Sequence, residues 1–119
     1  MKKNVLILLL TVTAICNAQI VSIADANFKI KLLGATSTNT IAKNLEGNFF
    51  KIDANNDGEI QQSEANNVSE LALNLDLNGQ SYKISNVIGI TNFTNLTRLD
   101  LRNNKIVTLN ISGLAYLTF

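Results

Sequence analysis

The sequence predicts an α+β fold in which a short N-terminal helical cap leads into the first turns of a repeat solenoid. Two observations predict it. Helix-compatible segments lie before residue 67, whereas leucines alternate with other residues from Leu71 to Leu77, as in a strand. The chain from Ile90 to Thr118 then matches itself at a shift of 21 residues, a period typical of stacked repeats. We expect the cap at residues 19–67 and the repeats at residues 68–119.

Residues 1–18 have the composition of a signal peptide. Met1-Lys2-Lys3 is a cationic start, an apolar run extends from Val5 to Ile15, and Ala18 offers a small residue for cleavage. The run is shorter than the ~20 residues of a comfortable membrane span, and no later segment could replace it. We expect a mature chain that starts at Gln19, has no membrane span, and is secreted or held at the cell surface.

Composition narrows the functional classes. The sequence has no histidine, and its one cysteine, Cys16, lies in the predicted signal peptide, so the mature chain has no disulfide, thiolate or imidazole chemistry. Without Lys2 and Lys3, eight basic residues remain against nine acidic ones, a net charge of −1 with no basic cluster. We expect no enzymatic activity and no nucleic-acid partner.

Two helices are expected in the cap. Ser22 and Asp25 have the spacing of a capping box, and the following residues place Ile30 and Leu33 on one face before Gly34 ends the helix. Residues 35–40 are rich in Ser, Thr and Asn and predict a loop. The segment from 41 to 52 is then compatible with a second helix, although Gly47 weakens its middle.

A cation-binding loop is predicted between Asp53 and Glu64. This segment satisfies every position of the pattern D-x-[DN]-x-[DN]-G-x5-E, so it resembles the calcium loops of EF-hands and dockerins. Calcium prefers six to eight hard oxygen ligands, which alternate short polar side chains can supply around one ion. Gly58 permits the backbone reversal, and Ile60 is expected to face the interior. The predicted ligands are Asp53, Asn55, Asp57, the carbonyl of Glu59, Gln61 and Glu64.

The loop has two interpretations. One is an Asn/Asp-rich turn that merely starts a helix; the other, which the match at every specified position favours, is a true Ca²⁺ site. A single loop in an exported protein indicates structural calcium rather than a sensor, with a dissociation constant on the order of 10⁻⁵ to 10⁻³ M. The ion would tie the two helical segments together.

The repeat segment carries a second motif. Residues 96–106 satisfy L-x-x-L-x-L-x-x-N-x-L with isoleucine last, so this part resembles leucine-rich repeats. In such a repeat Leu99 and Leu101 point inward, and Asn104 bonds backbone carbonyls of the turn. Together with the calcium loop, the mature chain is similar to the N-terminal part of exported bacterial leucine-rich-repeat surface proteins such as internalins. The resemblance implies adhesion or protein binding.

The resemblance also implies where a partner would bind. The outward strand positions Thr97, Arg98, Asp100 and Arg102 would contact an unknown protein or surface ligand, although they are equally compatible with a solvated polar face. The sequence stops at Phe119 within a repeat and shows no C-terminal cap, so we expect a truncated gene product.

Two alternative functions stay open at this point. The chain could be a calcium-binding protein whose loop is itself the function, as a buffer or switch. It could also be the N-terminal fragment of a larger secreted protein, such as the leader domain of a hydrolase. Calcium dependence of partner binding separates the first alternative from an interaction module.

Overall fold

The computed structural model describes residues 19–77 and 79–118. The predicted signal peptide, residues 1–18, lies outside the described residues. The helices and strands, in chain order, are α2 (Ala26–Leu33), β1 (Ala42–Asn44), α3 (Gln62–Ala65), β2 (Val68–Ala72), the 3-10 helix η1 (Ile90–Asn92) and β3 (Arg98–Asp100).

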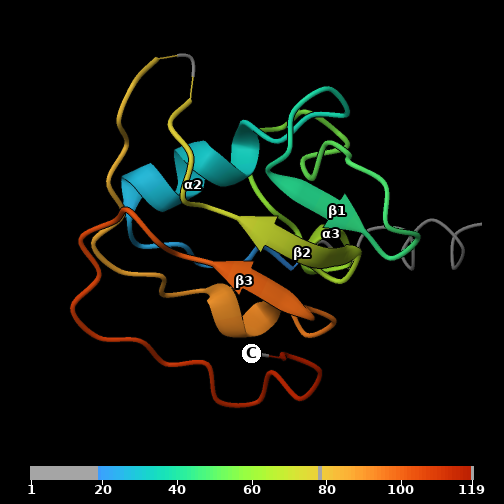
Figure 1. The fold of residues 1–119 in the computed structure, drawn as a ribbon. Helices are drawn as coiled ribbons and strands as arrows, with labels where there is room; N and C mark the ends of the chain where they lie inside the picture. The colour runs from blue at the N-terminus through green and yellow to red at the C-terminus, as the bar shows by residue number, and fades with distance from the viewer. Residues whose placement is uncertain (1–18, 78, 119) are drawn as a thin grey trace, which may run out of the picture.

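The strands form one mixed sheet with β2 in its centre (Figure 1). On one side β1 pairs antiparallel with β2, with Ala42 opposite Leu71. On the other side β3 pairs parallel with β2, with Leu71 opposite Leu99. The described part of the chain is therefore a small fold of mixed α and β structure.

The prediction of a repeat solenoid is wrong. The sheet holds one parallel pair, β2 with β3, because β1 pairs antiparallel on the other edge of β2, and the described residues after β3 form a long irregular loop instead of another strand (Figure 1). Of the residues paired by the 21-residue shift, Thr97 and Thr118 are in direct contact: the N–H and Oγ1 of Thr118 donate to the carbonyl of Thr97 at 3.0 and 3.1 Å. A single parallel strand pair is fewer than the three stacked units that a solenoid needs.

The predicted helix at residues 41–52 is also wrong, because this segment folds as β1 and a turn. The Oδ1 atom of Asn44 accepts hydrogen bonds from the backbone N–H groups of Glu46 and Asn48 at 3.0 and 2.9 Å. Gly47 adopts a φ of +85°, and the N–H of Phe50 donates back to the carbonyl of Ala42. Asn44 and Gly47 thus form a turn that replaces the regular backbone hydrogen bonds of a helix.

Helix α2 forms where it was predicted and ends at Gly34, but its cap and its buried face differ. Asp25, not Ser22, is the N-cap. The buried side chains are Phe28, Lys31 and Leu32, whereas Ile30 is 39% exposed. Lys31 can lie inside because its Nζ donates to the carbonyl of Leu73 at 2.7 Å, which replaces part of its hydration.

One apolar core joins the N-terminal and C-terminal parts of the fold. Its members come from the first segment, α2, the loop before α3, β2 and the region around η1; the largest fully buried apolar ones are Phe28, Phe93, Leu32, Ile52, Ile60, Leu71, Leu73, Ile84, Ile90 and Leu96. In the part of the chain that the structure describes, no helix is both long and apolar enough to cross a membrane.

The carboxylate of Asp25 joins α2 to a distant loop. One oxygen caps the helix through the N–H groups of Asn27 and Phe28 at 2.9 and 3.0 Å, and the other accepts from Ser85 and Asn86 at 2.8 and 3.2 Å. Burial acts to raise the pKa of Asp25, but these four donors together outweigh it and lower the pKa.

Replacing Asp25 with alanine is expected to lower the free energy of unfolding by about 2 kcal/mol, since a cap and two long-range bonds are lost together. Because the pKa of Asp25 is lowered on folding, its contribution is present above the unfolded pKa and is lost as the pH falls through the folded pKa. Urea unfolding at neutral and acidic pH measures both effects. Asp25→Asn keeps one acceptor oxygen and should lose less; an acid transition identical in all three proteins would contradict the assignment.

Gly89 holds the N-terminal segment close to the core. Its φ is +107°, and a Cβ atom there would lie 2.7 Å from the carbonyl oxygen of Ser22. Gly89→Ala is therefore expected to cost roughly 2–3 kcal/mol, from backbone strain and from a clash with backbone. Gly113→Ala is the matched control, because Gly113 has a φ of +85° but nothing within 4 Å of its Cβ position. Equal losses of stability in the two variants would show that the clash contributes nothing.

Candidate functional site

The loop from Asp53 to Glu64 follows one buried isoleucine, contains another, and ends within α3. Ile52 and Ile60 are 1% and 0% exposed, so the burial predicted for Ile60 is confirmed. Gly58 has a φ of +79° and nothing within 4 Å of a Cβ position. The glycine is thus required by the backbone turn alone, which leaves the space above it open.

The first and last residues of the loop hold its backbone together. Asp53 is 4% exposed, and its carboxylate accepts from the N–H groups of Asp57 at 3.2 Å and Gly58 at 3.0 Å. Glu64 is 8% exposed, and its carboxylate accepts from Ala54 at 2.8 Å and from Gln61 at 3.0 Å. Both carboxylates therefore point inward, toward the N–H groups of the loop.

Three of the predicted ligand side chains meet at the centre of the loop. One carboxylate oxygen of Asp57, Oδ2, lies 2.6 Å from the Nε2 of Gln61 and 3.3 Å from the Nδ2 of Asn55. The same Nδ2 of Asn55 lies 3.4 Å from the Oε1 of Gln61. These side chains come from loop positions two and four residues apart, as alternate positions around one ion would.

The side chain of Glu59 turns away from this centre. Its Oε1 accepts from the Nζ of Lys29 at 2.7 Å, with the two side chains 41% and 30% exposed. An ion pair this exposed adds little stability, but it joins the loop to α2. Glu59 therefore has only its backbone carbonyl to offer to the loop, which is the group predicted from the sequence.

The carboxylate of Asp57 is held in its charged form. The hydrogen bond from the backbone N–H of Glu59, 2.9 Å long, is the main cause that lowers the pKa of Asp57, and the bonds from Gln61 and Asn55 lower it further. The centre of the loop thus keeps a negative charge through the neutral and mildly acidic range.

The donor set of the loop fits a hard cation, although the carboxylates are not gathered into one cluster. Within residues 19–77 and 79–118 there is no group of three or more His, Cys, Asp or Glu side chains that is ready to hold a metal ion. What the loop offers instead is a mixed set of carboxylate, amide and carbonyl oxygens, the ligands that calcium takes in proteins.

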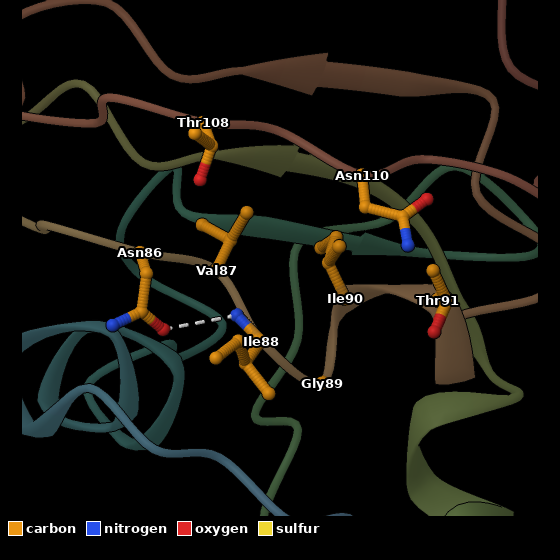
Figure 2. A pocket seen from close by; sticks show the side chains of 8 residues that line it. All are labelled: Asn86, Val87, Ile88, Gly89, Ile90, Thr91, Thr108 and Asn110. Carbon is orange, nitrogen blue, oxygen red and sulfur yellow. Dashed lines mark hydrogen bonds between the residues drawn. The ribbon is translucent and has the colours of Figure 1, made fainter.

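A separate hollow of about 210 Å³ lies between residues 86–91 and residues 108–110 (Figure 2). Its lining side chains are neutral amides, hydroxyls and aliphatic groups. Asn86 is partly committed, since its Oδ1 accepts from the N–H of Ile88 at 3.2 Å. None of the eight lining residues is titratable, so the hollow provides no acid or base.

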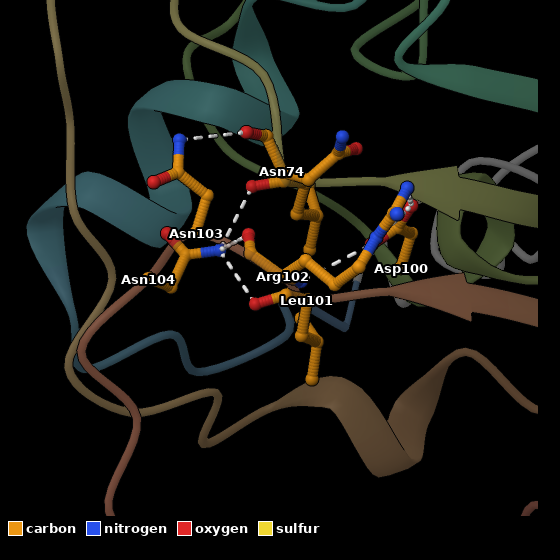
Figure 3. A network of polar contacts seen from close by, with 7 residues as sticks. Asn74, Asp100, Leu101, Arg102, Asn103 and Asn104 are labelled. Atoms are coloured by element: carbon orange, nitrogen blue, oxygen red, sulfur yellow. Dashed lines mark hydrogen bonds and ion pairs between the residues drawn. The ribbon is translucent and has the colours of Figure 1, made fainter.

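The outward positions predicted to contact a partner lie in and beside β3, and three of the four are engaged within the chain. Arg102 forms a two-pronged ion pair with Asp100, at 3.0 Å from Nε and 2.7 Å from Nη2 (Figure 3). This pair lowers the pKa of Asp100. The Oγ1 of Thr97 donates to the carbonyl of Ser69 at 2.9 Å. Arg98 and Arg102 remain exposed to solvent.

The pairing of the first described segment with the loop was missed by sequence reasoning. Residues 19–21 run antiparallel to residues 60–62, with an isolated bridge between Ile20 and Gln61. The β-branched residues Ile20, Val21 and Ile23 are a signal of extended structure that could have indicated it. The bridge joins positions 41 residues apart, so it could not be read from a local pattern.

In comparisons with known proteins, no protein-family model, no curated protein and no solved structure matches the chain.

Proposed function

We propose that this chain is a non-enzymatic interaction module stabilised by one Ca²⁺ ion in the loop from Asp53 to Glu64. The observation that carries the proposal is the meeting of Asn55, Asp57 and Gln61 beside the turn at Gly58. The ligand set is the one predicted from the sequence: Asp53, Asn55, Asp57, the carbonyl of Glu59, Gln61 and Glu64.

The chemistry of the loop centre supports a cation. The Oδ2 of Asp57 is approached by two amide nitrogens, which carry the positive ends of the side-chain amide dipoles. These nitrogens occupy the surroundings that a cation would take. Calcium binding would turn the amides of Asn55 and Gln61 so that their oxygens face the ion, and its double charge would attract the carboxylates of Asp53 and Glu64.

The loop's connections favour a structural role for the ion over a buffer or a switch. Glu59 is paired with Lys29 of α2, Ile60 lies in the core, and Glu64 lies in α3 just before β2. Fixing the loop would therefore fix three elements at once, and metal binding of this kind contributes directly to folding free energy.

The interaction role and the location rest on two further features. Arg98 and Arg102 give the outer side of β3 an exposed basic character around the fixed carboxylate of Asp100, which suits a protein or surface ligand with acidic groups. The composition of residues 1–18 supports export, so that the module would act outside the cell or at its surface.

Thermal unfolding with and without calcium tests the structural role. At a calcium concentration 100-fold above the dissociation constant, the folded state gains about 2.7 kcal/mol, and for a domain of about 100 residues this raises the Tm by about 10–20 °C. Magnesium should give a much smaller rise, because it demands octahedral geometry. A Tm that millimolar calcium leaves unchanged would mean that calcium does not bind the folded chain preferentially, and the proposed structural role would fail.

A further inference from the structure

The first segment of the described chain is joined to the proposed calcium loop by two backbone hydrogen bonds. The N–H of Val21 donates to the carbonyl of Ile60 at 2.8 Å, and the N–H of Gln62 donates to the carbonyl of Gln19 at 2.7 Å. The bridge between Ile20 and Gln61 lies between them. The partner of the segment is therefore the last third of the loop itself, including one predicted ligand, Gln61.

The segment is otherwise lightly held at its outer end. Gln19 is exposed and Ile20 is 51% exposed, whereas Val21 is 5% exposed. Beyond Val21 the chain is fixed by the close approach of Ser22 to Gly89 and by the four hydrogen bonds of Asp25. Detachment of residues 19–21 leaves the contacts of α2 with Ser85 and Asn86 in place, and it exposes one core side chain, that of Val21.

We propose that residues 19–21 are a calcium-dependent latch, docked on residues 60–62 when the loop holds its ion and released when the ion leaves. This inference rests on the proposed function of the loop. The physical link is Gln61 together with the carbonyls and N–H groups on either side of it: an ion that fixes Gln61 and the carbonyl of Glu59 also fixes the edge on which the latch pairs. A docked latch in turn holds this edge in place for the ion, so each binding event strengthens the other.

The latch follows directly on the predicted cleavage point after Ala18, so it would form the N-terminus of the exported chain. With little calcium, as inside a cell, the segment is released and extended; with the abundant calcium outside, it docks. Calcium thus sets whether the N-terminus of the exported chain is accessible.

A pair of substitutions at Gln62 separates the latch from the ion site. Gln62 is the first residue of α3, a position that accepts proline, and Gln61 before it has φ −81° and ψ 158°, which suits a residue preceding proline. Gln62→Pro therefore removes the N–H that binds Gln19 while the helix start is retained. Gln62→Ala is the control, because it loses the same side-chain bonds to Asn66 and Asn92 but keeps the N–H.

The experiment measures amide hydrogen exchange at Val21, with CaCl₂ and with EGTA, alongside calcium affinity by calorimetry. In the parent and in Gln62→Ala, calcium should slow exchange at Val21 by at least about fivefold. In Gln62→Pro, calcium should still bind, about fivefold more weakly, and leave exchange at Val21 nearly unchanged.

Two results would overturn the latch and are distinct from each other. If calcium binds all three proteins and slows exchange at Val21 equally in each, protection comes from stability of the whole fold and the latch is wrong, while the ion site stands. If the parent binds no calcium in the calorimeter, the proposed function itself fails and the latch fails with it.

Discussion

Replacing Glu64 with alanine is expected to lower the free energy of unfolding by about 3 kcal/mol even in EGTA, and to abolish calcium binding as well. The carboxylate is 8% exposed and accepts from the backbone N–H groups of Ala54 and Gln61. Its removal leaves donors at both ends of the loop without their partner, and each buried unpaired group costs about 1–3 kcal/mol. Urea unfolding in EGTA measures the first effect, and calorimetry the second.

Two controls separate the hydrogen bonds of Glu64 from its charge. Glu64→Gln keeps an acceptor oxygen of the same reach, so the expected loss in EGTA is smaller, whereas calcium binding should still be strongly weakened because the carboxylate charge is gone. Ser63→Ala changes an exposed neighbour in the same helix and should alter neither quantity. If Glu64→Ala were as stable as Ser63→Ala in EGTA, the carboxylate would not be holding the loop.

Replacing Asn104 with alanine is expected to destabilise the fold by about 3–4 kcal/mol. Its Nδ2 donates to the carbonyls of Leu73, Leu101 and Arg102, each at 3.0 Å (Figure 3). Its Oδ1 accepts from the N–H of Ile84 at 3.0 Å. The carbonyl of Leu73 keeps a donor in Lys31. The loss therefore falls on the carbonyl of Leu101 and the N–H of Ile84, and unpaired groups away from water cost about 1–3 kcal/mol each.

The neighbouring asparagine is the matched control for this prediction. Asn103 has a φ of 63° and makes one long contact, 3.4 Å from its Nδ2 to the carbonyl of Asn74. Glycine adopts positive φ without strain, so Asn103→Gly should be within about 0.5 kcal/mol of the parent. Thermal or urea unfolding of the two variants compares them directly. Similar losses at both positions would contradict the claim that Asn104 organises the turn.

Local signals explain the parts of the fold that the sequence predicted. Helix α2 begins and ends within residues that carry cap and stop signals, and Gly34 ends it as expected. The turn at Gly58 and the burial of Ile60 follow from a 12-residue pattern with its own geometry. The bonds from Asn104 to the carbonyls of its turn were predicted from the repeat motif and are confirmed. Each of these depends on residues close together in the chain.

Long-range pairing explains what the sequence did not predict. The segment at 41–52 was expected to be helical, but its first residues pair with β2 more than twenty residues later. The solenoid fails because the described residues after β3 form no further strand, although the period of 21 residues extends into them. Lys31 would be expected at the surface, and is buried because the carbonyl of Leu73 lies within reach of its Nζ. No local pattern contains these partners.

The candidate site likewise has features that the local sequence pattern predicts and others that it does not. The resemblance to a calcium loop predicts six ligand residues, and the structure brings the side chains of three of them, Asn55, Asp57 and Gln61, together. The pattern does not show that the carboxylates of Asp53 and Glu64 bind backbone N–H groups, or that residues 19–21 pair with the loop. These contacts depend on the folded path of the chain.

Calorimetric titration of calcium into the protein, beside a variant carrying both Asp53→Ala and Glu64→Ala, tests the central claim most directly. We predict one binding event per chain in the parent, with a dissociation constant on the order of 10⁻⁵ to 10⁻³ M, and none in the variant. Because both substitutions also remove bonds to the loop backbone, circular dichroism must show the variant folded at the temperature of the titration. No binding in the parent at millimolar calcium, or equal binding in the folded variant, would contradict the assignment of the loop as a calcium site.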